Sequence, residues 1–362
     1  MKKIIILFIL ILSLTGCKDY VEINDLAILT GIVIDYKDNM YEVTAQLIVN
    51  DKDSNIEVFK TKSNSINEAI AELSKLSNKE IFISHLKVLI VTDTVIKENI
   101  DFKDYFLRSS KSKMNFYVYV INNEISEKVL NVYKKNDGSS IYLEKMMKFN
   151  QNIFSSSTPL KFSDYAYYTY EKGYNLIYPK IKIVKNNNKE VLYLSNLTTF
   201  KDDNEIELSE NESIFYNIVS NKAIKATVTI KCDDNNFSVE LQDIKTKYKW
   251  KNNKFTISNK TNSKVIDYKC KYDLTKKESI EKLNKLTSNY IKDNINNLLT
   301  FIKDNNKDVI GIGNYIYKHD KNYFKDKNKW KNYLNNIEFK IDTKTNITSI
   351  GEIKKWKNLM KK

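Results

Sequence analysis

Few side chains in this sequence could take part in catalysis, and they are widely separated. The chain has 362 residues but only 2 histidines and 3 cysteines. His85 directly follows Ser84, and such residue types could provide a nucleophile and its base. The apolar run around them predicts a strand, on which adjacent side chains point to opposite faces, so we expect no catalytic pair. His319 is surrounded by charged residues and is expected at the surface.

One segment resembles part of a calcium-binding loop. Asp51, Asp53 and Asn55 have the first three spacings of such a loop. Ile56 stands where the loop needs glycine, and Lys62 stands where it needs a bidentate glutamate. The segment therefore predicts a hairpin turn. Two histidines are also too few for a usual zinc site, so we expect no metal.

Gly311 and Gly313 raise the question of a nucleotide-binding loop. The pair lacks the third glycine of a dinucleotide fingerprint, and no strong strand precedes it. A break between two helices fits the segment better. Because no motif for catalysis or cofactor binding is complete, we expect a non-enzymatic protein without a cofactor.

The N-terminal residues predict export and a lipid anchor. Lys2 and Lys3 precede an apolar run, Ile4–Leu14, which is too short to span a bilayer. Small residues then lead to Cys17, as in the cleavage site of a lipoprotein signal peptide. We expect residues 1–16 to be removed and acyl chains on Cys17 to hold the protein at a membrane without a spanning helix.

The charge of the chain favours some partners over others. The net charge is +14, but Arg108 is the only arginine among 59 basic residues. Nucleic-acid readers rely on arginine forks, so we expect no nucleic-acid partner. Lysines beside anionic lipid fit this composition better, and an ordinary solvated surface is the simpler interpretation.

Cys232 and Cys270 both lie in segments that predict strands. Outside the cytoplasm they could form a disulfide, which requires their Cα atoms to lie within ~7 Å. Alternatively, they are two small buried residues, which is the simpler interpretation. The sequence leaves both possibilities open.

The first part of the chain predicts strands that alternate with helices. Ser65 begins a helix that carries its apolar residues on one face as far as Leu76. The segment 81–91 predicts a buried strand, and 124–133 predicts a further helix. Such alternation indicates an α/β module, which we place at residues 17–135.

The remaining sequence predicts a middle module at 136–195 and a C-terminal α+β module at 196–362. Helices are expected from Ser139 or Ser140 and at 162–170, followed by an antiparallel sheet over 180–272. One apolar stripe over 280–302 predicts a long amphipathic helix, and 337–347 alternates as a closing strand. The predicted fold is therefore multi-domain α+β, with mixed and antiparallel sheets and packed helices.

Several segments stand in order after the cysteine of the lipoprotein signal: Glu22–Ile28, Thr30–Asp35, Ser84–Val91, Asp104–Arg108, Ile310–Lys318 and Trp330. Together they resemble the GerC family, also written GerAC or Ger(x)C. The family provides the C subunit of nutrient germinant receptors of spores. Two family features differ here, because Lys18-Asp19 replaces Trp-Asp and Ser109-Ser110 replaces Asp-Pro.

The resemblance implies a subunit required for nutrient-triggered germination, on the outer face of the spore inner membrane. It would assemble with integral-membrane A- and B-type subunits. Cys17 is the expected lipidation site. The other motif positions are candidates for structural roles or partner contacts: Glu22, Asn24, Asp25, Gly31, Ser84, His85, Lys87, Arg108, Gly311 and Gly313.

A solute-binding lipoprotein of a membrane transporter is the alternative. That class needs two similar lobes around a cleft, whereas the β-rich middle and the long helix near the C-terminus predict lobes of different kinds. The sequence identifies neither the nutrient nor the partner subunits.

Overall fold

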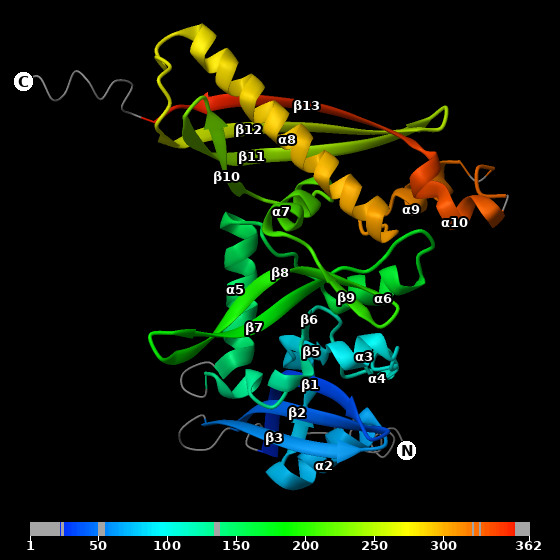
Figure 1. The fold of residues 1–362 in the computed structure, drawn as a ribbon. Coiled ribbons are helices and arrows are strands. Elements are labelled where there is room, and N and C mark those ends of the chain that lie inside the picture. Colours follow the sequence, from blue (N-terminus) through cyan, green and yellow to red (C-terminus); the bar gives the residue numbers. More distant parts are fainter. Residues whose placement is uncertain are drawn as a thin grey trace, which may run out of the picture.

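The computed structural model describes residues 22, 25–49, 55–133, 138–320, 322–325 and 327–351. These residues form two α+β lobes stacked end to end (Figure 1). The lower lobe in this view is built on a sheet of nine strands, and the upper lobe on a sheet of four. The predicted α+β class with mixed sheets and packed helices is confirmed.

The larger sheet has a parallel centre and antiparallel flanks. Its order is β3-β2-β1-β5-β6-β7-β8-β9, and β4 pairs with the beginning of β1. Strands β1, β5 and β6 run parallel, whereas β2, β3, β8 and β9 join antiparallel. The strands are β1 (Leu26–Lys37), β2 (Met40–Val49), β3 (Asn55–Ser63), β4 (Glu80–Phe82), β5 (Val88–Thr92), β6 (Tyr117–Ile121), β7 (Tyr178–Asn186), β8 (Lys189–Lys201) and β9 (Asn204–Glu207).

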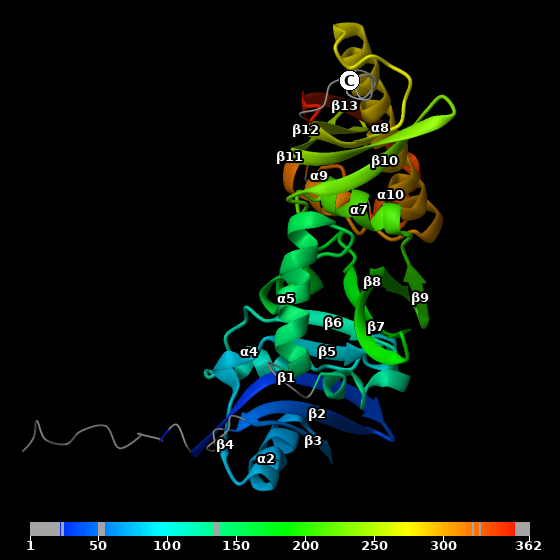
Figure 2. The ribbon, with the colours of Figure 1, turned by 90° about the vertical axis from the view of Figure 1, so that its left-hand side faces the viewer.

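Both faces of this sheet are buried, as a parallel centre requires. Val118 and Val120 of β6 face one core cluster, and Tyr117, Tyr119 and Ile121 face the other. One face is covered by α2 (Ile66–Ser77), α3 (Asp93–Lys97), α4 (Lys103–Arg108) and α6 (Phe162–Tyr170). The opposite face is covered by α5 (Gly138–Ile153), which lies across β5 and β6 in Figure 2.

In the smaller lobe the order is β10-β11-β12-β13, with β13 parallel to β12. Its strands are β10 (Ala226–Cys232), β11 (Asn235–Lys251), β12 (Lys254–Tyr268) and β13 (Glu338–Ser349). One face packs against a shared core with α7 (Glu210–Val219), α8 (Lys277–Asn305), α9 (Ile312–His319) and α10 (Lys327–Asn336). The long amphipathic helix and the closing strand are therefore confirmed as α8 and β13.

Three sequence predictions within the fold are wrong. Residues 81–91 do not form one strand, because a 3₁₀ turn, η2 (Ile83–His85), separates β4 from β5 and leaves His85 exposed. Residues 124–133 form two short 3₁₀ segments, η3 (Asn123–Ile125) and η4 (Val129–Asn131), in place of a helix. Residues 180–272 belong to two sheets, with α7 between them.

Helix α7 was missed because it is buried on every side. Its last seven residues are all buried, so the sequence shows no amphipathic period. Its start is nevertheless marked, since Ser209 and Glu212 form a reciprocal capping box. The division into three modules stays a prediction, and β8 runs across its second boundary, between 195 and 196.

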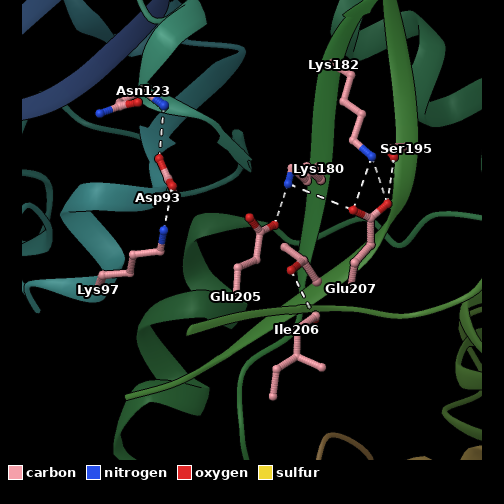
Figure 3. A network of polar contacts seen from close by, with 10 residues as sticks. Asp93, Lys97, Asn123, Lys180, Lys182, Ser195, Glu205, Ile206 and Glu207 are labelled. Carbon is pink, nitrogen blue, oxygen red and sulfur yellow. Dashed lines mark hydrogen bonds and ion pairs between the residues drawn. The ribbon is translucent and has the colours of Figure 1, made fainter. Parts of the chain in front are cut away.

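A buried ion pair holds the far edge of the larger sheet together (Figure 3). The Lys180 ammonium on β7 lies 2.6 Å from Glu205 on β9, and its side chain is only 5% exposed. Glu207 accepts from Lys182 at 2.9 Å and from Ser195 at 3.2 Å. Because an unpaired charge in this position would be costly, each partner requires the other.

Cys232 and Cys270 form a disulfide, with Cα atoms 6.0 Å apart. The interpretation of two unpaired buried cysteines is therefore wrong. The bond joins the end of β10 to the residues that follow β12, across a separation of 38 residues. Sequence spacing could not show this, because only the register of β10 on β11 and β11 on β12 brings the two cysteines together.

We expect the Cys232→Ser/Cys270→Ser double variant to unfold more easily. Closing a loop of 38 residues stabilises the fold by about 4 kcal/mol in the chain-entropy estimate. Urea unfolding with and without reductant measures this loss, and reductant should affect only the parent chain. Labelling of both cysteines by an alkylating reagent in the unreduced, unfolded parent would contradict the bond.

Candidate functional site at the joint between the lobes

A fully buried carboxylate organises the loop between α8 and α9. Asp308 is only 1% exposed. Its Oδ1 accepts from the backbone N–H of Ile312 at 2.9 Å, and its Oδ2 accepts from that of Gly313 at 2.7 Å. The Tyr333 hydroxyl of α10 donates to Oδ2 at 2.5 Å. The side chain thereby caps α9 and ties it to α10.

The backbone of the same residue joins the two lobes. Asp308 N–H donates to Oδ1 of Asn175 at 2.7 Å, and Asn175 N–H donates to the Asp308 carbonyl at 2.8 Å. Asn175 belongs to the loop between α6 and β7, in the larger lobe. Close by, Asn314 N–H donates to the carbonyl of Gly173 at 3.0 Å. We call this group of contacts the joint.

Burial raises the pKa of Asp308 to about 6, although donors from Tyr333, Gly313 and Ile312 oppose the shift. The folded chain therefore binds this proton more tightly than the unfolded chain does. The contribution of the carboxyl group to stability is greatest below its ordinary pKa of 3.8 and declines as the pH rises through about 6. At neutral pH the ionised group depends on its three donors.

A second polar contact supports the joint from the α7 side. The side-chain amide of Asn217 is buried and donates to the carbonyls of Ser155 and Ser157 at 2.8 and 2.9 Å. The Ser155 hydroxyl in turn donates to the Lys225 carbonyl at 2.6 Å. These contacts bind the loop after α5 to the smaller lobe, so the lobes are connected at two separate points.

Gly311 and Gly313 lie in the joint, and the predicted break between two helices is confirmed there. Gly311 is the N-cap of α9, with φ of 74°. A Cβ on Gly313 would lie 2.8 Å from the ring and hydroxyl of Tyr333. These two motif positions therefore permit close backbone approach.

Gly31 and Lys87 lie together in the centre of the larger lobe. Lys87 N–H donates to the Thr30 carbonyl at 2.9 Å, and Gly31 pairs with Val88 across the sheet. A Cβ on Gly31 would lie 2.6 Å from Cβ of Ser140 on α5. This part of the motif fixes how α5 sits on the sheet.

Ser84 and His85 are placed differently from the prediction. They lie on the 3₁₀ turn η2 rather than on a strand. The Ser84 hydroxyl donates to the Lys111 carbonyl at 2.7 Å, while the exposed His85 ring lies 5.4 Å from the ring of Phe82. Both line a cavity of about 220 Å³ together with Lys87.

Arg108 lies far from the joint, at the edge of a larger open cavity of about 790 Å³ between α2 and α4. Its Nε donates to both oxygens of Asp104 at 2.8 Å, and its side chain is 79% exposed. Lys111 pairs with Glu80 at 2.7 Å on the same rim. Both cations that line this cavity are thus already paired with a carboxylate.

In the N-terminal motif segment, Glu22–Ile28, the Asp25 N–H donates to the Glu22 carbonyl at 2.9 Å, in a turn before β1. Cys17 and Asn24 lie outside the described residues, as does most of the segment 51–55.

Among the residues that the structure describes, no group of three or more potential ligands could hold a metal ion. Within the same residues, no helix has the length and apolar character needed to cross a membrane.

Sequence reasoning missed Asp308, Tyr333, Asn175 and Gly173. Asp308 stands three residues before Gly311, which places a carboxylate beside the first turn of α9 and was a usable capping signal. Tyr333, Asn175 and Gly173 gave no such signal, because their roles depend on contacts between distant segments. Together these residues define a structural joint whose polar atoms are occupied by one another.

The architecture is that of a two-lobed α+β protein in which two motif glycines, Gly311 and Gly313, lie at the joint between the lobes. Two family models match most of the chain. Residues 19–183 match the spore germination protein N-terminal domain, and residues 195–351 match the spore germination B3/GerAC-like C-terminal domain. The chain belongs to this GerAC family of spore germination proteins.

Individual relatives agree with this assignment. Spore germination protein KC of Bacillus subtilis (strain 168) is 23% identical over 387 residues, which cover 96% of this chain and 95% of the relative. Spore germination protein A3 of the same organism is 24% identical, with 71% of each chain covered. The crystal structure of the GerBC protein has the same fold, with a TM-score of 0.54 and 16% identity, over 88% of this chain and 97% of that one.

We expect Tyr333→Phe to lower the free energy of unfolding by about 1–3 kcal/mol, because a buried carboxylate loses one of its donors. Urea unfolding at neutral pH measures the change. Tyr193→Phe is the matched control, since Tyr193 is 55% exposed on β8. Equal stabilities of the two variants would contradict the role given to Asp308.

We expect Gly173→Ala to be more destabilising than Gly351→Ala. Both glycines have positive φ, 69° and 77°, so both alanines carry similar backbone strain of about 1–2 kcal/mol. Only at Gly173 would the new Cβ also meet the backbone of Gly313, at 2.7 Å, which adds about 1–3 kcal/mol. Urea midpoints that fall equally in the two variants would show that close approach does not matter at the joint.

Proposed function

We propose that this chain is a lipid-anchored, non-enzymatic subunit of a nutrient germinant receptor. It would be held by a lipid on Cys17 at the outer face of the spore inner membrane. There it would assemble with integral-membrane A- and B-type subunits. The observation that carries the proposal is the match to spore germination protein KC over almost the full length of both chains.

The joint supports a role in assembly rather than in catalysis. Both oxygens of Asp308 are occupied by donors from the chain itself. The Ser84 hydroxyl likewise donates a hydrogen bond to the Lys111 carbonyl. A rigid connection between two lobes suits a protein that holds other subunits in fixed relative positions.

The solute-binding alternative receives less support. That class needs two similar lobes, whereas the sheets here have nine and four strands in different orders. The largest cavity of those described lies within the first lobe, between α2 and α4, and not between the lobes. We therefore retain the receptor subunit as the proposed function.

Germination of spores tests this proposal. In a strain without other nutrient receptors, deletion of the gene should abolish the release of core solutes in response to nutrients. Germination by a trigger that bypasses receptors should remain normal. We expect Cys17→Ala to reduce nutrient-triggered release more than tenfold, because the tether is lost.

Ser13→Ala is the matched control, since it alters the same N-terminal segment but retains the cysteine. It should germinate as the parent strain does. A full nutrient response in the deletion strain would contradict the receptor role. A full response in Cys17→Ala alone would contradict only the need for a lipid.

A further inference from the structure

The outer face of the smaller sheet carries an unusual arrangement of lysines. Over the ends of β11, β12 and β13, outward side chains of the three strands are in register, in four rows of three. The rows are Lys245–Lys260–Lys344, Lys247–Ser258–Asp342, Lys249–Thr256–Lys340 and Lys251–Lys254–Glu338. We call these twelve residues the lysine face. Eight are lysines and two are acidic.

Most of these lysines have no acidic partner. Lys254 pairs with Glu338 at 2.7 Å, and Lys340 pairs with Asp342 at 3.0 Å. Within the described part of the chain the other six make no ion pair: Lys245, Lys247, Lys249, Lys251, Lys260 and Lys344. All six are exposed. Lysines without an ion pair also occur elsewhere among the described residues, so the distinguishing feature of this face is that its lysines lie opposite one another in rows.

This arrangement opposes folding. Directly opposite residues on neighbouring strands have Cβ atoms about 4.5–5.5 Å apart, and like charges there are destabilising. The row Lys245–Lys260–Lys344 places three like charges side by side across three strands. A face that exists only to be solvated would gain stability from one acid in this row. The repulsion is relieved when an anionic surface covers the lysines.

We propose that the lysine face docks on an anionic phospholipid surface. The twelve positions include no aromatic residue and no arginine, whereas protein interfaces favour aromatic and arginine anchors and are depleted in lysine. Tyr248 and Trp250 of β11 point to the opposite side, where they donate to Val219 and Asp320. The face also lacks the stacking rings and arginine side chains with which proteins hold the bases of single-stranded nucleic acid. Diffuse electrostatic attraction to anionic lipid headgroups requires neither aromatic rings nor arginines.

The position of the lysine face agrees with a membrane-bound N-terminus, and in this respect the inference rests on the proposed function. In Figure 2, β11, β12 and β4 lie toward the left, while α8 covers the other side of the upper sheet. Strand β4 pairs with Leu26 at the beginning of β1. Leu26 is nine residue steps from Cys17, a span of at most about 30 Å. One membrane surface can therefore reach both the tether and the lysine face.

Vesicle binding tests the docking separately from germination. The probe is a chain that begins at Lys18, which retains every described residue but cannot carry the lipid. We expect it to sediment with vesicles of phosphatidylcholine that contain about one third phosphatidylglycerol, and not with pure phosphatidylcholine. Because exposed charges are screened within about 10 Å at 0.1 M salt, binding should weaken steeply as salt is added.

Two triple variants with the same change in net charge locate the surface. In Lys245→Gln/Lys260→Gln/Lys344→Gln the partition onto anionic vesicles should fall about 100-fold, at about fivefold for each lysine. Lys276→Gln/Lys285→Gln/Lys292→Gln changes exposed lysines at the start of and along α8 and should lose less than fivefold. The first variant should have an unchanged or higher urea midpoint, because it removes repulsion, so misfolding cannot explain its loss.

Several results would overturn the proposal. Equal losses in the two triple variants would mean that only net charge matters, and no sedimentation with anionic vesicles would exclude lipid as the occupant. If the first variant bound vesicles normally but impaired germination, the face would instead dock an acidic protein. The two proposals can also fail separately. If vesicle binding depends on the lysine face but deletion of the gene leaves germination intact, the docking inference holds and the proposed receptor function is wrong.

Discussion

One of the two connections between the lobes is organised around a buried carboxylate, that of Asp308. Because Asp308 is almost fully buried, bulk solvent does little to stabilise its charge at neutral pH, so each of its donors is required. Those donors come from α9 and α10, and the backbone of the same residue pairs with Asn175 in the other lobe. Satisfying this single group therefore fixes two helices and one interlobe loop together.

The need for close approach at such points explains where glycine is used. The chain has only 7 glycines. At Gly31, Gly138, Gly173, Gly311 and Gly313 an added Cβ would lie within 3.0 Å of another residue. Gly31 allows α5 to pack closely on the larger sheet, and Gly173 and Gly313 lie in contact at the joint. The motif glycines thus mark places where segments far apart in sequence must touch, and no nucleotide phosphate is needed to explain them.

Sequence periodicity predicted the elements that have one buried and one exposed face. The helix from Ser65 and the long helix α8 are of this kind, whereas α7 is buried all round and was mistaken for sheet. Residues 81–91 were read as one apolar strand because Ile83 and Leu86 are buried even though a turn interrupts the pairing. At the joint, the glycines were visible and Asp308 stood close enough to them to be a capping signal, but its pairing with Asn175 was not visible, because that contact joins backbone and side chain across 133 residues of sequence.

The joint also allows a contact at the lysine face to orient the whole molecule. A lipid attached ahead of β1 restrains distance from a membrane but leaves the attached body free to rotate about the tether. A second contact removes that freedom only if it is rigidly connected to the first. The connection here runs from β1 through the larger sheet to Asn175, across Asp308, and then through α9 and Tyr315, whose hydroxyl donates to the Tyr248 carbonyl of β11 at 2.8 Å. In the proposed tethered state, the backbone contacts between Asp308 and Asn175 would therefore also determine which face the molecule turns away from the membrane, and hence which surface membrane-embedded partners could reach.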